Sequence, residues 1–262
     1  MTITPDTGEF VRYEIDRHIV TITIDSPGTG NAVDGPVALG LSAAIDALES
    51  DDDVWVGIIT GVPPVFCVGA DQLAVGRDEA APAHTRDAGL AGLVERDRTT
   101  PLIAAVDGPA SAEGAEIALA CDLVVASTDS TFGIPAVRSG LVASAGGSFR
   151  LGRKIPFNRA MEIALTGDSI DCATAVEYGL VNASCMPGDA LETARILAQR
   201  ITTNAPVSVR ETRAIMIETT WADDATAWRR SVEATATVMA TQDRHEGVSA
   251  FLEKRPPRWS GR

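Results

Sequence analysis

Cysteine is scarce in this chain of 262 residues, and its few occurrences are far apart: Cys67, Cys121, Cys172 and Cys185. None of them forms a C-x-x-C pair, which disfavours the disulfide framework of a small secreted protein. Histidine is rarer still, with three residues that share no metal-ligand spacing with cysteine or carboxylates. We therefore expect reduced thiols and no metal site.

Long apolar runs and positive charge are also lacking. No apolar run reaches the roughly 20 residues that a membrane-spanning helix needs. The first ten residues are acidic and lack the basic segment and apolar core of a secretion signal. The 22 Lys and Arg residues are outnumbered by 36 Asp and Glu, giving a formal net charge of −14. These absences argue against nucleic acid or a membrane as partner and predict a cytoplasmic protein.

Apolar residues are plentiful, at 45% of the chain, and their pattern alternates between strand and helix. Such alternation is typical of an α/β core with a largely parallel sheet. After residue 188 the strand pattern stops and a helical pattern continues to about residue 252. We predict an α/β core over 1–188 and a helical region over 189–262. The core begins with a hairpin over 11–24 and a helix after Asp34, followed by strands at 54–60, 102–106 and 123–126.

Two segments, Phe66–Leu73 and Asp107–Glu116, each run from an apolar strand through small residues into a predicted helix. The first N–H groups of a helix lack intrahelical acceptors and point at whatever lies beyond the helix start. Two such junctions that face each other could hold a developing oxyanion between two N–H groups. Glu116 follows the second junction closely enough to move a proton near that oxyanion. The two segments therefore predict an active site.

These segments resemble the enoyl-CoA hydratase/isomerase (crotonase) superfamily, and the resemblance covers essentially the whole chain. It implies an α/β fold, a crotonase-like spiral of repeated ββα units, followed by a C-terminal helical trimerisation region. It also implies an acyl-CoA thioester as substrate, no metal or redox cofactor, and a homotrimer or dimer of trimers. Further matching segments are Pro27–Ala32, Phe132–Pro135, Leu141–Arg150, Thr166–Asp168, Gly179–Val181 and Phe251–Arg255.

By the same resemblance, the thioester carbonyl would lie between the N–H groups of Ala70 and Glu113, with Glu116 as the main acid/base. Ala70 and the residues after it, Asp71, Gln72 and Leu73, would also contact coenzyme A. The C-terminal twenty residues are locally basic, and Lys254 is our choice for a contact with the CoA phosphates. A solvated basic tail is the alternative interpretation of these C-terminal cations.

Two positions depart from the family pattern. Family hydratases carry a second glutamate directly after the proline that matches Pro135, whereas this chain has Ala136. The family also favours glycine where this chain has Glu113. Glu113 and Glu116 share a helix face, so Glu113 could supply the missing carboxylate; alternatively it caps or solvates the helix start.

The sequence leaves two main classes of function open, besides a structural or interaction subunit that binds no CoA. The first is an enoyl-CoA hydratase/isomerase-type enzyme that relies on the single retained Glu116. Ala136 places ordinary hydration in doubt, whereas isomerisation, hydrolysis or a lyase reaction needs only one carboxylate. The second class is a catalytically impaired acyl-CoA binding protein of the same fold.

Overall fold

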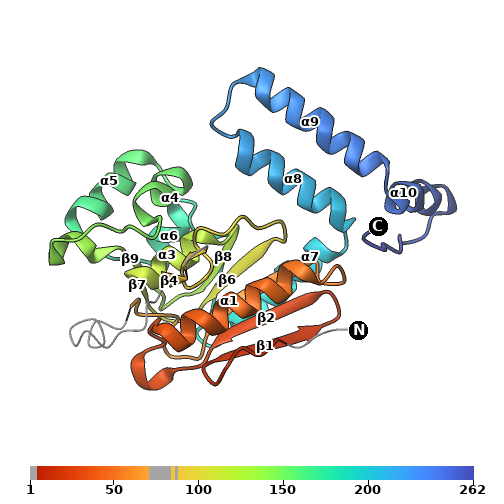
Figure 1. The fold of residues 1–262 in the computed structure, drawn as a ribbon. Coiled ribbons are helices and arrows are strands. Elements are labelled where there is room, and N and C mark those ends of the chain that lie inside the picture. Colours follow the sequence, from red (N-terminus) through yellow and green to blue (C-terminus); the bar gives the residue numbers. More distant parts are fainter. Residues whose placement is uncertain (1–4, 71–83, 86–87) are drawn as a thin grey trace.

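The computed structural model describes residues 5–70, 84–85 and 88–262. Its centre is a six-stranded sheet in the order β1-β2-β3-β6-β8-β11 (Figure 1). The first two strands pair antiparallel and every later neighbour is parallel. The prediction of a largely parallel α/β core is therefore confirmed. The strands of this sheet are β1 (Val11–Asp16), β2 (Ile19–Ile24), β3 (Val56–Gly61), β6 (Leu102–Val106), β8 (Leu123–Ser127) and β11 (Ala183–Cys185).

The first helix, α1 (Gly35–Ser50), begins where the sequence predicts it. The Asp34 side chain accepts a hydrogen bond from the Val37 N–H at 2.9 Å, and proline stands in the first turn, where its missing N–H costs nothing. Its apolar stripe, which includes Leu41 and Leu48, is fully buried against the sheet. Local capping and helical periodicity thus agree with the tertiary packing.

The two faces of the sheet are covered by different parts of the chain. Alternate strand residues such as Ile59 and Ala104 belong to the larger core, together with α1 and α3 (Glu113–Ala120). Their neighbours Ile58 and Ile103 face the opposite way and pack with Ala194 and its surroundings on α7 (Ala190–Thr202). The period of two along a strand explains this division. The first helix after residue 188 thus covers one face of the sheet, and the boundary between 188 and 189 stays a prediction.

A second, small sheet in the order β10-β9-β7 lies beside α3. It consists of β7 (Ala110–Ser111), β9 (Thr131–Gly133) and β10 (Ile170–Asp171). The short β4 (His84–Thr85) and β5 (Gly89–Leu90) pair antiparallel. Among the described residues, the other helices of the core are η1 (Pro27–Thr29), η2 (Pro135–Ser139), α4 (Gly147–Lys154), α5 (Phe157–Thr166) and α6 (Cys172–Glu177).

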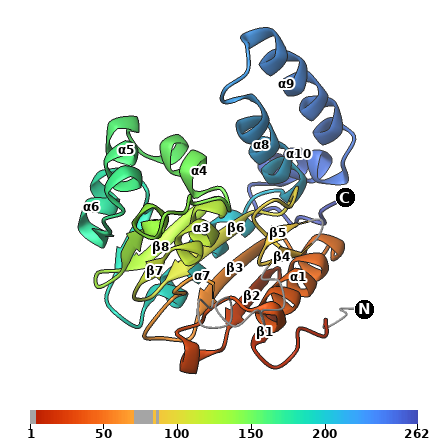
Figure 2. The ribbon, with the colours of Figure 1, turned by 60° about the vertical axis from the view of Figure 1, so that its left-hand side comes forward.

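The C-terminal helices are α8 (Pro206–Thr219), α9 (Asp224–Met239) and α10 (Gln242–Glu253). Figures 1 and 2 show α8 and α9 as an antiparallel pair that extends away from the sheet. The predicted breaks near 204–206 and 221–223 are confirmed. A further break at Ala240 and Thr241 was not predicted; the Thr241 hydroxyl accepts from the Arg244 N–H there and caps α10. Within the described part of the chain, no helix is long and apolar enough to cross a membrane.

Candidate active site

The described part of the first predicted junction, up to Ala70, lies beside the second junction. Cys67 and Ala110 form a parallel bridge, and the Ser111 N–H donates to the Cys67 carbonyl at 3.0 Å. A Cβ placed on Gly114 would lie only 2.1 Å from that same carbonyl oxygen. Backbone pairing and the missing side chain of Gly114 therefore hold the junctions together, as the sequence predicts.

Gly69 marks the closest approach of the first junction to the second. Its φ of +100° favours glycine, and a Cβ there would lie 2.9 Å from the Glu113 nitrogen. The same Cβ would lie 2.9 Å from the Cβ of Ala112. The residue before Ala70 thus abuts the start of α3, which brings the segments of the two predicted N–H donors into contact.

The start of α3 is an unusual turn. Ala112 has φ 50° and ψ −125°, a conformation that glycine adopts far more readily than alanine. The turn is held by a hydrogen bond from the Ala112 N–H to the Gly133 carbonyl at 2.9 Å. Glu113 follows as the first residue of α3, so its own N–H has no intrahelical acceptor. The role of this N–H as an oxyanion donor stays a prediction.

The Glu113 side chain reaches back to the first junction. Its Oε2 accepts a hydrogen bond from the Ala70 N–H at 3.0 Å, and the side chain is half-buried. The sequence predicted either a replacement acid/base group or a cap at the helix start. The structure shows a third arrangement, in which Glu113 binds the backbone N–H that we assigned to the oxyanion. Sequence reasoning missed this contact because it joins residues 43 positions apart.

Glu116 lies one turn further along α3 and is 3% exposed. Its Oε1 accepts a hydrogen bond from the Gly147 N–H at 2.8 Å. Burial raises the pKa of Glu116 and the charge of Glu113 raises it further, whereas the Gly147 N–H and the Arg150 guanidinium oppose this rise. A carboxyl group whose pKa is raised towards neutrality is suited to both accept and release a proton.

The N-terminus of α4 supports Glu116. A Cβ on Gly147 would lie 2.9 Å from both Cγ and Oε1 of Glu116, so glycine permits this contact. The guanidinium of Arg150 donates to the Ala145 carbonyl at 3.0 Å and to the Val94 carbonyl, and thereby fixes the turn before α4. We did not single out Gly147 or Arg150 from the sequence. The glycine pair 146–147 ahead of a helical pattern was the available signal.

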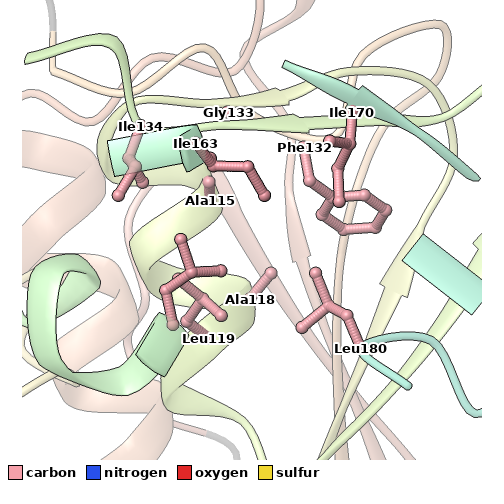
Figure 3. Close-up of a pocket in the computed structure, with 10 residues that line it drawn as sticks. Ala115, Ala118, Leu119, Phe132, Gly133, Ile134, Ile163, Ile170 and Leu180 are labelled. Atoms are coloured by element: carbon pink, nitrogen blue, oxygen red, sulfur yellow. The ribbon is translucent and has the colours of Figure 1, made fainter. Parts of the chain in front are cut away.

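The opposite face of α3 is packed and apolar. Figure 3 shows Ala115, Ala118 and Leu119 pointing into a small cavity of about 10 Å³. Its other lining residues are Phe132, Gly133, Ile134, Leu151, Ile163, Ile170 and Leu180. No polar side chain of the described residues lines this cavity. Polar chemistry on α3 is therefore confined to the side that carries Glu113 and Glu116.

Comparison with known proteins identifies the family. The sequence pattern of the enoyl-CoA hydratase/isomerase family matches residues 14–262. The chain belongs to the enoyl-CoA hydratase/isomerase (crotonase) superfamily. The crystal structure of an enoyl-CoA hydratase from Mycobacterium tuberculosis is 43% identical, covers 97% of this chain and 99% of its own, and superimposes with a TM-score of 0.93. The mixed α/β fold with its C-terminal helical region is thus the crotonase fold.

Curated relatives agree with this assignment. The mevalonyl-coenzyme A hydratase sidH of Aspergillus fumigatus is 38% identical over 92% of this chain and 91% of its own length. The 2,3-dehydroadipyl-CoA hydratase of Escherichia coli is 32% identical over 94% of this chain and 96% of its own. This member of the crotonase superfamily is accordingly of the enoyl-CoA hydratase type, whose substrates are acyl-CoA thioesters.

The departure at Ala136 lies in η2, directly after β9 and Pro135. Its methyl group is half-buried and packs against the main core. The Ala136 carbonyl accepts from the Leu141 N–H at 3.0 Å, which closes the turn that follows. The backbone of this segment is therefore ordered by local bonds, and what it lacks is a side chain able to carry a proton.

The predicted coenzyme A contacts stay predictions. Asp71, Gln72 and Leu73 lie outside the described residues. Lys254 is exposed and ends α10 in a left-handed conformation. Figure 1 draws α10 apart from α3.

Proposed function

We propose that this crotonase-superfamily member binds the carbonyl oxygen of an acyl-CoA thioester between the N–H groups of Ala70 and Glu113, and that Glu116 moves the proton. The observation that carries the proposal is the placement of Glu116. Its buried carboxyl group lies one helical turn from the Glu113 N–H, on the same helix. A proton-transfer group and an oxyanion donor thus share one rigid element.

The chemistry follows from polarisation of the thioester. Two N–H groups aimed at the carbonyl oxygen stabilise the enolate that forms when a proton leaves the adjacent carbon. Each such donor contributes roughly 3–4 kcal/mol in acyl-transfer enzymes. Glu116 can remove a proton at one end of a three-carbon unit and return it to the other end. Isomerisation of the double bond therefore balances with one carboxyl group.

Hydration makes a further demand. Water must lose a proton as its oxygen bonds to Cβ, and Cα must gain one. Family hydratases divide this work between two glutamates, and Ala136 can neither accept nor donate. Loss of one such group costs about 10²–10⁴-fold in rate. We therefore propose that proton shuttling by Glu116 is the stronger activity and hydration the weaker one.

The second candidate function is acyl-CoA binding without turnover. Two observations favour it: the Glu113 carboxylate occupies the Ala70 N–H, and Ala136 leaves the second acid/base position empty of a titratable group. Under this alternative the N–H groups of Ala70 and Glu113 still bind the thioester, whereas the protein no longer transfers protons to or from it.

We also propose a homotrimer or dimer of trimers. The support is the set of large apolar side chains exposed on α8–α10 and their connections, among them Trp221 between α8 and α9, Trp228 and Phe251, at 70%, 71% and 82% exposure. Such a surface is typical of one that a partner covers. Light scattering coupled to size-exclusion chromatography measures the state directly, and a monomer at micromolar concentration contradicts the proposal.

Turnover and binding must be measured together to separate the two functions. Crotonyl-CoA and longer 2- and 3-enoyl-CoAs are incubated with wild type and with Glu116→Gln. Glu192→Gln, an exposed carboxylate at the start of α7, serves as the control. If the protein is an enzyme, wild type turns over an enoyl-CoA, and Glu116→Gln lowers this turnover at least 100-fold while it still binds the enoyl-CoA. Binding without turnover supports the alternative, and no binding of any acyl-CoA contradicts both.

A further inference from the structure

The Glu113 carboxylate occupies one of the two N–H donors that the proposed function assigns to the substrate. Its Oε2 lies 3.0 Å from the Ala70 nitrogen, at ordinary hydrogen-bond length. The thioester oxygen would accept from the same N–H. In this structure Oε2 of Glu113 therefore takes the place at the Ala70 N–H that we propose for the thioester oxygen.

The Glu113 carboxylate lies close against the backbone of the first junction. A Cβ on Gly69 would lie 2.4 Å from Oε2 of Glu113, so the carboxylate is packed directly against the glycine of the first junction. A backbone N–H has one hydrogen, and in this structure that of Ala70 is donated to Glu113. The substrate oxygen can reach Ala70 only after the carboxylate withdraws.

Charge decides which oxygen the N–H prefers. A hydrogen bond from an N–H to a carboxylate is roughly twice as strong as one to a neutral carbonyl. A ground-state thioester therefore competes poorly with Glu113. An enolate oxygen carries negative charge and competes on nearly equal terms, so the contact discriminates between the bound ground state and the reacting state.

From this arrangement we infer that Glu113 is an internal competitor for the oxyanion site: its carboxylate holds the Ala70 N–H in the free protein, and the oxygen of a bound thioester must displace it, which costs binding of the neutral thioester more than binding of the enolate. The inference deepens the proposed function and rests on it. It differs from the idea that Glu113 replaces the missing acid/base group, because it assigns Glu113 to binding of the carbonyl.

The test compares two ligands that differ only at the carbonyl. Butyryl-CoA has the thioester oxygen, whereas S-butyl-CoA, a thioether, lacks it. Dissociation constants for both are measured by isothermal titration calorimetry with wild type, Glu113→Ala and Glu113→Gln. Removal of one negative charge affects both ligands alike, because both carry the same phosphates, and Glu192→Gln measures that general effect.

The ratio of the two dissociation constants is the readout. We expect Glu113→Ala to tighten the binding of butyryl-CoA about 10-fold relative to that of S-butyl-CoA. Glu113→Gln should give a smaller change, because its neutral amide oxygen still competes for the Ala70 N–H, though less strongly than a carboxylate. Retained binding of S-butyl-CoA shows that the variants fold. An unchanged ratio in both variants overturns the inference and leaves the proposed function intact. Failure of both ligands to bind any form of the protein overturns the proposed function as well.

Discussion

The amide nitrogen of Gly147 lies 2.8 Å from Oε1 of Glu116. This hydrogen bond joins the start of α4 to the first half of α3 and gives a buried carboxyl group a backbone partner. A carboxyl group buried without such a partner would be costly. The bond therefore fixes the position of Glu116 and moderates the rise in its pKa, and both effects can be tested.

Substitution of Gly147 by alanine should displace Glu116. The new Cβ would lie 2.9 Å from both Cγ and Oε1 of the glutamate, too close for either to stay. Because a shift of about 1 Å in a catalytic group can cost 10²-fold, we expect turnover of an enoyl-CoA to fall about 100-fold. Gly152→Ala, in the same helix, meets only Phe157 at 3.5 Å and serves as the control. Equal activities in the two variants would contradict the prediction.

The pH dependence of stability should report the raised pKa of Glu116. Burial raises this pKa above the ordinary value of 4.5, so the folded chain favours the protonated group. The resulting stabilisation is present below pH 4.5 and is lost as pH rises through the pKa of the folded state. Glu116→Gln cannot ionise and escapes that loss. The unfolding free energy of Glu116→Gln minus that of wild type, both measured by urea titration, should increase between pH 4.5 and neutrality. A difference that does not change with pH would contradict the prediction.

Substitution of Ala112 by glycine should stabilise the folded protein. Its φ of 50° and ψ of −125° store strain of about 1–3 kcal/mol, which glycine would relieve. The greater freedom of glycine in the unfolded chain offsets about 0.4–1 kcal/mol of this gain. We expect the unfolding free energy of Ala112→Gly to rise by about 1 kcal/mol. The control Ala236→Gly, at an exposed position within α9, should lower it by about 1 kcal/mol. A loss of stability in both variants argues against strain at Ala112.

A carboxyl group at position 136 should restore hydration. Pro135 and the rest of η2 already fix the backbone at position 136, and only a carboxyl group is missing from its side chain. We expect Ala136→Glu to raise hydration of crotonyl-CoA at least 10-fold, in the direction of the 10²–10⁴-fold that such a group supplies. Ala136→Gln adds the same bulk without a titratable proton. Equal hydration rates in the two variants would show that the missing acid does not limit the reaction.

Much of the fold could be predicted because its signals are local. Asp34 ahead of a helical apolar pattern fixes α1, and short apolar runs fix the strands of a parallel sheet. The family resemblance supplied what local signals could not, namely that two distant junctions meet. The break at Thr241 escaped prediction because its cap is a single threonine within a polar stretch.

The site was less predictable than the fold. The sequence indicated Glu116, but its partner Gly147 lies 31 residues away and contributes only a backbone N–H. The contact between Glu113 and Ala70 has no sequence signal, since a glutamate at a helix start is ordinary and favourable there. Contacts of this kind depend on how close two backbones pass, which Gly69 and Gly114 determine.

The pairing of Cys67 with Ala110 has a consequence for redesign. Because main-chain bonds hold the two junctions together, the shape of the proposed oxyanion site depends on the backbone, and substitutions at positions 113 and 136 leave these bonds in place. The side chains at positions 113 and 136 can therefore be exchanged while the backbone around them keeps its shape. A small combinatorial library at these two positions would explore several reactions of one bound thioester without disturbing a single strand.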